Sequence, residues 1–159
     1  MIFVTVGSDL PFNRLVRVVD DWAAERGRTD VFAQIGETGW RPRHIPYCQF
    51  LEPAEFQQKI REASVIISHA GMGTILTALS AQRPILVMPR LHALFEIRNE
   101  HQLATVRRLQ ETGAVAVALD EEVLRERLDH LEDVTPPVKI SHNSDTQLIS
   151  ALRDYIAKG

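Results

Sequence analysis

Cysteine, basic charge and long apolar runs are all scarce in this sequence, and each shortage excludes a class of protein. With Cys48 as the only cysteine, no disulfide can form within the chain, which fits a reducing compartment. No apolar run approaches the ~20 residues that a membrane-spanning helix needs. A net charge of -3 lacks the basic footprint of a nucleic-acid-binding protein. We therefore expect a cytoplasmic protein that does not bind nucleic acid.

The rest of the composition is that of a globular domain. The chain has 159 residues, 45% of them apolar, which suffices for one domain with a sizeable core. Its first segment, MIFVTVG, is too short for a secretion signal and lacks the preceding basic residues, so it is predicted to be a buried strand. We expect a single domain over residues 1–159.

Apolar residues alternate between the short runs of buried strands and the 3.6-residue period of helices. Strands are predicted at 2–6, 30–35, 47–51, 65–68, 85–88 and 114–119. Helices are predicted at 13–26, 53–62, 74–81, 99–112, 121–131 and 144–158. Strands that alternate with helices form a mostly parallel sheet covered on both faces. The predicted fold class is α/β, a Rossmann-like parallel sheet with helices on both faces.

The segment ISHAGMGTILTAL, residues 67–79, carries the most informative motif. Gly71 and Gly73 stand where a predicted strand gives way to a helix. A helix N-terminus exposes unpaired N–H groups, and glycines there let a diphosphate approach the backbone. The hydroxyl of Thr74 suits either a helix cap or a hydrogen bond to phosphate. The same glycines also suit a tight turn without a ligand, and the local sequence supports both interpretations equally.

The position of this motif excludes two familiar phosphate-binding loops. The Gly-Lys-Ser/Thr triplet of a Walker loop is absent. A dinucleotide fingerprint would follow the first strand, whereas this double glycine follows the fourth, which disfavours a nicotinamide oxidoreductase. Parallel sheets bind ligands beyond the carboxyl ends of their strands. The loops expected to matter most are therefore 7–12, 36–46, 69–74 and 89–99.

A second polar motif, RNEHQLATV, opens the helix predicted at 99–112. Asn99 and Gln102 have the spacing of a capping box, which is one interpretation of the motif. With Glu100, they also offer donors and acceptors for a sugar or ribose in the crevice that holds the glycine motif. The sequence leaves both interpretations open.

Four segments in this order and spacing resemble a known family: VTVGSDLPFNRLV, SHAGMGTILTAL, PILVMPR and NEHQ. The sequence is similar to the family 28 glycosyltransferase C-terminal domain, especially its short, free-standing members in dolichol-pathway and bacterial exopolysaccharide synthesis. The resemblance implies the donor-binding half of a GT-B transferase, with a UDP-sugar as substrate, no cofactor and no metal. It also implies inverting transfer to a polyprenyl-diphosphate-linked sugar at the cytoplasmic face of a membrane. A separate membrane-anchored subunit would bind that acceptor, and the helix at 144–158 is expected to dock it.

The resemblance also implies which residues bind the donor. The expected substrate-binding residues are Gly7, Ser8, His69, Gly71, Met72, Gly73, Thr74, Arg90, Asn99, Glu100 and Gln102. His69 is a weak candidate for the catalytic base, because an ordinary imidazole titrates near neutrality. In GT-B enzymes this base usually comes from the acceptor half. Arg90 is expected near the leaving UDP.

One position departs from the family pattern. Thr77 stands where relatives commonly carry a glutamate, which in larger transferases binds the ribose hydroxyls. Either Glu100 takes over this role or the nucleotide lies in a shifted position. Trp40 has two interpretations, stacking on a base or sugar and anchoring its own loop. A non-catalytic nucleotide-sugar-binding module is the alternative function.

Overall fold

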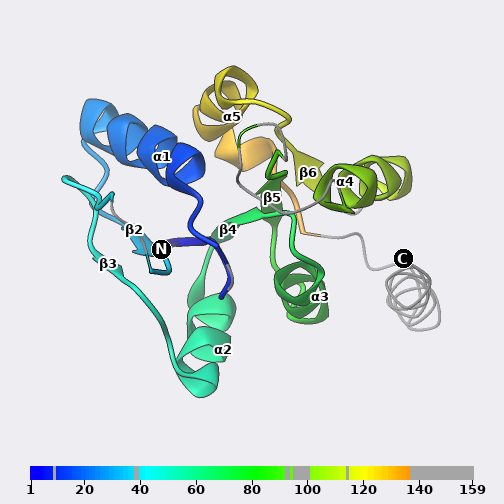
Figure 1. Cartoon of the computed structure of the whole chain (residues 1–159), viewed down its shortest axis with the longest axis horizontal. Coiled ribbons are helices and arrows are strands. Elements are labelled where there is room, and N and C mark those ends of the chain that lie inside the picture. The colour runs from blue at the N-terminus through cyan, green and yellow to red at the C-terminus, as the bar shows by residue number, and fades with distance from the viewer. Residues whose placement is uncertain (9, 38–39, 92–93, 95–100, 114, 137–159) are drawn as a thin grey trace.

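A computed structural model of the chain contains a six-stranded sheet flanked by helices (Figure 1). It describes residues 1–8, 10–37, 40–91, 94, 101–113 and 115–136. The strands are β1 (Ile2–Thr5), β2 (Val31–Gln34), β3 (Tyr47–Cys48), β4 (Val65–His69), β5 (Ile85–Met88) and β6 (Ala116–Val117). The helices are α1 (Asn13–Arg26), α2 (Pro53–Glu62), α3 (Met72–Ser80), α4 (His101–Thr112) and α5 (Glu121–Leu128), followed by a 3-10 turn at Leu131–Asp133.

The order of the strands places a ligand-binding crevice next to β1. The strands are all parallel and lie in the order β3-β2-β1-β4-β5-β6. The chain moves outward from β1 through β2 to β3 and then returns to the other side of β1 as β4. Such a reversal is the point at which open parallel sheets bind ligands. Thr5 lies opposite both Gln34 and Ser68, so β1 and β2 end at the same level and β4 extends one residue further.

Helices cover both faces of the sheet, as the sequence predicts. Figure 1 shows α1 and α5 above the sheet and α2 and α3 below it. The upper core is built around buried residues such as Leu15, Trp22 and Leu124. The lower core includes Ile60 and Ile75, together with residues of α4. Because both faces are covered, β1 is buried along its whole length and its sequence is apolar up to Thr5, a buried polar residue.

Several predicted boundaries are wrong, mostly at the edges of the sheet. The strands predicted at 47–51 and 114–119 each contain only two residues, and both are edge strands with one pairing partner. The helix predicted at 74–81 begins earlier, at Met72, because Gly71 is its N-cap. The helix predicted at 121–131 ends at Leu128. The helix predicted at 144–158 lies outside the described residues, among which no helix is long and apolar enough to cross a membrane.

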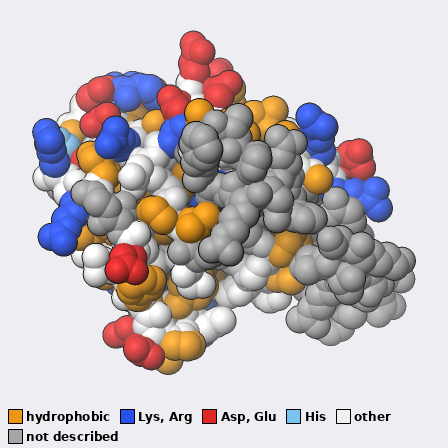
Figure 2. All heavy atoms as spheres, viewed as in Figure 1, with side chains coloured by type: hydrophobic (Ala, Val, Ile, Leu, Met, Phe, Trp, Pro, Cys, Tyr) orange, Lys and Arg blue, Asp and Glu red, His pale blue; other side chains and the backbone are white. Residues whose placement is uncertain are grey.

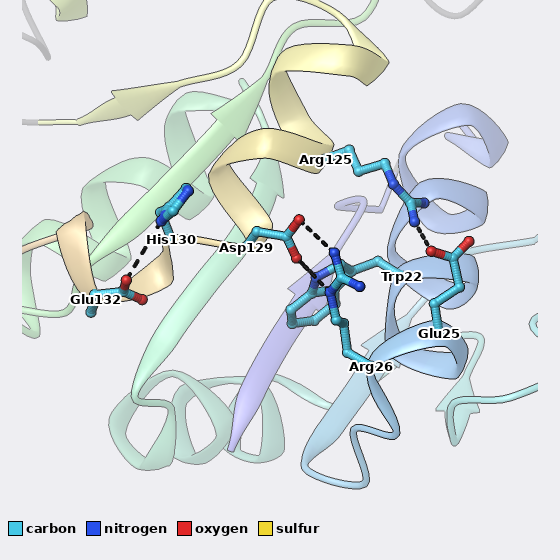
Figure 3. A network of polar contacts seen from close by, with 7 residues as sticks. All are labelled: Trp22, Glu25, Arg26, Arg125, Asp129, His130 and Glu132. Atoms are coloured by element: carbon cyan, nitrogen blue, oxygen red, sulfur yellow. Dashed lines mark hydrogen bonds and ion pairs between the residues drawn. The ribbon is translucent and has the colours of Figure 1, made fainter.

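Polar contacts join α1 to the end of α5 on the upper face (Figure 3). The carboxylate of Asp129 accepts a hydrogen bond from Trp22 Nε1 at 3.0 Å and two from Arg26 at 2.8 Å. The Arg26 guanidinium, and then the indole N–H, hold the pKa of Asp129 below its usual range. Arg125 forms an ion pair with Glu25 beside them. These contacts tie the last described helix to the first.

A buried carboxylate fixes the loop before β3. Asp20 is 1% exposed on α1 and accepts hydrogen bonds from the backbone N–H groups of Arg43, His44 and Ile45, at 2.9 to 3.0 Å. Trp40 in the same loop packs against the upper core, and the Arg17 guanidinium lies 5.2 Å from its ring centroid. The structure therefore places Trp40 as an anchor of its own loop.

Candidate functional site

A cavity of about 360 Å³ lies at the carboxyl ends of the strands, between the starts of α2 and α3. It is lined by Gly7, Ser8, Gln34, Phe50, Leu51, Pro53, Phe56, Gln57, Gly73, Thr74 and Thr77. The structure thus brings together two predicted pairs of residues from loops far apart in the sequence, Gly7 with Ser8 and Gly73 with Thr74. The wall formed by residues 50–57 was not predicted.

The two glycines of the motif have different surroundings. At Gly71 the backbone angles are ordinary for the residue before a helix, with φ of -80°. A Cβ there would lie 2.0 Å from Cε1 of His69. A Cβ on Gly7, whose φ is +77°, would lie 2.6 Å from Nε2 of the same ring. Gly71 therefore requires a glycine because the His69 imidazole packs against it, and Gly7 requires one because of both this ring and its left-handed φ.

Gly73 instead faces open space. A Cβ added there would meet no atom within 4 Å, and the residue lines the cavity in the first turn of α3. The N-cap residue Gly71 has no side chain with which to pair the first N–H groups of the helix. These groups and the positive end of the helix dipole favour an anion. The part of the motif that suits a phosphate is thus its second glycine and Thr74.

His69 is buried behind this corner and is a poor proton acceptor. This residue is 8% exposed and lies at the end of β4. Burial, and then the charge of Arg90, lower the pKa of His69 from 6.5 to about 3. A general base works best with a pKa near the operating pH. The geometry therefore favours a packing role for His69 over the weak catalytic role suggested by the sequence.

The depressed pKa of His69 predicts a stability that falls on mild acidification. Below about pH 6.5 the unfolded chain binds a proton on this imidazole, whereas the folded protein does not until about pH 3. Between pH 7 and pH 5 this single group should lower the free energy of unfolding by about 2 kcal/mol. Urea denaturation across this range measures the loss, and His69→Gln should remove it. An equal pH dependence in that variant would contradict the assignment.

Arg90 joins the loop after β5 to the loop after β1. It is 2% exposed, and its Nη2 donates hydrogen bonds to the carbonyl oxygens of Val6, at 2.6 Å, and Leu10. Its guanidinium also lies 5.4 Å from the ring centroid of Phe12. These contacts hold the backbone on both sides of Gly7 and Ser8. The geometry therefore favours Arg90 as a positioning residue for the loop.

Gln34 lines the cavity and is not among the residues predicted from the sequence. Its Oε1 accepts a hydrogen bond from Thr5 at 2.6 Å, and its Nε2 donates to the carbonyls of Gly7 and Gln49 at 3.1 and 2.7 Å. The side chain thus sets the spacing of two loops that line the cavity. A buried polar residue at the end of a predicted strand was the available signal.

The apolar wall of the cavity is partly open to solvent. Phe50 is 54% exposed, while Phe56 is held by an edge-to-face contact with Phe3 at a centroid distance of 5.8 Å. Figure 2 shows hydrophobic side chains over α2, the first turn of which forms part of this wall. On the opposite side, the Thr77 hydroxyl donates to the Gly73 carbonyl at 2.7 Å and keeps its acceptor capacity. The cavity therefore combines an apolar wall, polar side chains and a helix N-terminus.

The remaining predicted residues lie elsewhere or are not described. Met72 is half-buried and packs against the lower core. Gln102 is the second residue of α4, but its side chain is not described, and Asn99 and Glu100 lie outside the described residues. Within the described ranges, no three His, Cys, Asp or Glu side chains are grouped so that they could hold a metal ion.

This architecture is that of the C-terminal half of GT-B glycosyltransferases. MurG of Acinetobacter baumannii superposes with a TM-score of 0.60 and 17% identity, over 96% of this chain and 49% of that one. The glycotransferase of kitacinnamycin superposes with a TM-score of 0.60 and 19% identity, over 96% of this chain and 38% of that one. The solution structure of ALG13 superposes with a TM-score of 0.62 and 19% identity, over 92% of both chains. This chain thus spans less than half the length of the first two proteins.

The family follows from the sequence as a whole. Residues 1–155 match the model of the glycosyltransferase family 28 C-terminal domain. The chain belongs to this family and is a donor-binding domain of a glycosyltransferase.

Proposed function

We propose that this chain binds the UDP-sugar in a two-component inverting glycosyltransferase. The sugar passes to a polyprenyl-diphosphate-linked acceptor held by a membrane-anchored partner subunit, at the cytoplasmic face of the membrane. The observation that carries the proposal is the cavity, which joins an apolar wall to the N-terminus of α3. Because His69 is buried and a poor base, the partner supplies the group that activates the acceptor.

The donor's parts match the parts of the cavity. The uracil ring packs on the wall formed by Phe50 and Leu51, which has an apolar face for a flat base. Residues 73, 74 and 77 lie on one side of α3, since residues three and four apart share a helix face. The diphosphate therefore lies at Gly73 and Thr74, and the ribose lies one turn further along, near Thr77. The Thr77 hydroxyl oxygen accepts from ribose in place of a carboxylate, alongside Glu100.

The same arrangement favours departure of the nucleotide. Cleavage of the sugar–phosphate bond leaves negative charge on the diphosphate, and no metal is needed if fixed donors neutralise it. The first N–H groups of α3 and the helix dipole are donors of this kind, fixed before the reaction begins. Arg90 and Gln34 keep the facing loop in place while the charge develops.

Truncation of the exposed aromatic ring tests the proposed base-binding wall. Phe50→Ala should weaken UDP binding about tenfold, because stacking of a base on an aromatic side chain contributes roughly 1–3 kcal/mol. The melting temperature without nucleotide should change little, since Phe50 is 54% exposed. Calorimetric titration with UDP measures the first effect, and a thermal scan measures the second.

Leu119→Ala is the matched control, because Leu119 is also exposed and does not line the cavity. It should bind UDP like the unmodified protein. Stabilisation by NAD and not by UDP would refute the proposed donor. UDP binding without sugar transfer, in the presence of the partner and acceptor, would favour the non-catalytic alternative.

A further inference from the structure

A second cavity, of about 560 Å³, lies between α2 and α3 on the lower side of the sheet. Figure 1 shows the two helices side by side there. The cavity is lined by Gln57, Arg61, Leu76, Thr77, Ser80, Ala81 and Arg83. Gln57 and Thr77 also line the first cavity, so the two share a wall. Because both helices start at the carboxyl edge of the sheet, Arg61 and Arg83 lie at the end remote from the glycine motif.

The charge of this cavity has one sign. Its two ionisable lining residues are arginines, and the described part of the chain places no carboxylate in an ion pair with either of them. The carboxylate of Glu62, the neighbour of Arg61, instead accepts a hydrogen bond from Gln58 at 2.7 Å. Gln57 and Ser80 add uncharged donors to the lining. The cavity lining therefore has two positively charged hydrogen-bond donors and no carboxylate to pair with them.

One of these donors is buried. The Nε of Arg83 is inaccessible to solvent and has no hydrogen-bond partner among the described residues. Arg61 lies in the last turn of α2, and the backbone N–H of Arg83 donates to the Ala78 carbonyl at the end of α3, so each arginine stands at the C-terminal end of a helix dipole. Buried polar groups are nearly always hydrogen-bonded, and one left unpaired is destabilising. Since solvent does not reach this Nε, a ligand in the cavity binds the Nη groups of the same guanidinium.

We propose that the second cavity binds a phosphate group, held by Arg61 and Arg83. A planar guanidinium matches phosphate oxygens and binds them in pairs. The site is separate from the nucleotide's diphosphate, which the proposed function places at Gly73 on the other side of the shared wall. The group comes from a soluble phosphate ester or from a phospholipid headgroup.

Titration of the full chain with inorganic phosphate tests the site. The NMR signal of the Arg83 Nε–H group is the readout. We expect a saturable shift of this signal, with affinity reduced about tenfold or more in Arg61→Gln. Arg127→Gln removes the same charge from an exposed position on α5 and should bind like the unmodified protein. A shift of the Gly73 amide alone would overturn this proposal and leave the proposed function intact. An equal loss in Arg127→Gln would also overturn it, because charge alone would then explain the binding.

A second experiment identifies the source of the phosphate and includes a variant at the other arginine. Phosphatidylcholine vesicles with and without phosphatidic acid are sedimented with the protein and with Arg83→Gln. Binding that requires both phosphatidic acid and Arg83 identifies a lipid headgroup. Binding of free phosphate without vesicle binding identifies a soluble ester. The proposal is overturned if phosphate does not shift the Arg83 Nε–H signal and Arg83→Gln does not change binding to the phosphatidic acid vesicles.

Discussion

Addition of one methyl group at residue 71 is expected to lower the free energy of unfolding by about 2–3 kcal/mol. In Gly71→Ala the new Cβ would lie 2.0 Å from Cε1 of His69. Gly7 also packs against the imidazole, which limits how far the ring can withdraw. Either the ring or the start of α3 must move, and both changes disturb the corner at the cavity. Urea denaturation measures the loss of stability.

Gly73→Ala is the matched control, since its Cβ would meet no atom within 4 Å. It should unfold no more easily than the unmodified protein, because alanine favours a helix over glycine by roughly 0.5–1 kcal/mol. It should nevertheless weaken UDP binding, because the methyl group occupies the proposed diphosphate site. The double variant His69→Ala/Gly71→Ala should regain part of the stability lost at residue 71. Normal stability of Gly71→Ala alone would show that the ring moves freely.

Removal of the Asp20 carboxylate is expected to cost about 3 kcal/mol of stability. Its oxygens accept from three backbone N–H groups, those of Arg43, His44 and Ile45, and Asp20→Ala leaves these donors without their acceptor. Burial of unpaired donors is the main term, because Asp20 is only 1% exposed. Equilibrium denaturation in urea gives the magnitude.

The neighbouring Asp21 provides the comparison for this variant. Asp21 lies on the exposed side of α1, so Asp21→Ala removes the same charge without removing these hydrogen bonds. We expect its stability to change by less than about 0.5 kcal/mol. Equal effects of the two substitutions would mean that net charge, and not the loop anchor, determines the loss.

The fold could be predicted from the sequence because its elements have strong local patterns. The apolar run Ile2–Val4 is typical of a strand buried on both faces, and α1 begins and ends where predicted, with Gly27 in a left-handed conformation after it. The lengths of β3 and β6 could not be predicted. An edge strand extends only as far as one neighbour pairs with it, and that pairing is not visible in local sequence.

The candidate site could be predicted only where it depends on the backbone. Gly73 and Thr74 were found because a strand-to-helix corner has a recognisable pattern. The role of Gly71 was hidden, since it depends on the position of the His69 ring rather than on the backbone angles of the glycine. Gln34 was missed because its three hydrogen bonds reach residues 15 to 29 positions away. Contacts of this length follow from the sheet order.

The hydrogen bonds of Arg90 have a consequence for the synthesis of this protein. The lining of the first cavity that the structure describes lies between residues 7 and 77, so the first half of the chain carries all of it. The guanidinium that holds Val6 and Leu10 belongs to a residue 84 and 80 positions further along. Contacts between distant residues form late, because closing a long loop costs entropy. In a nascent chain, the described lining residues therefore leave the ribosome before the arginine that fixes the shape of the cavity does.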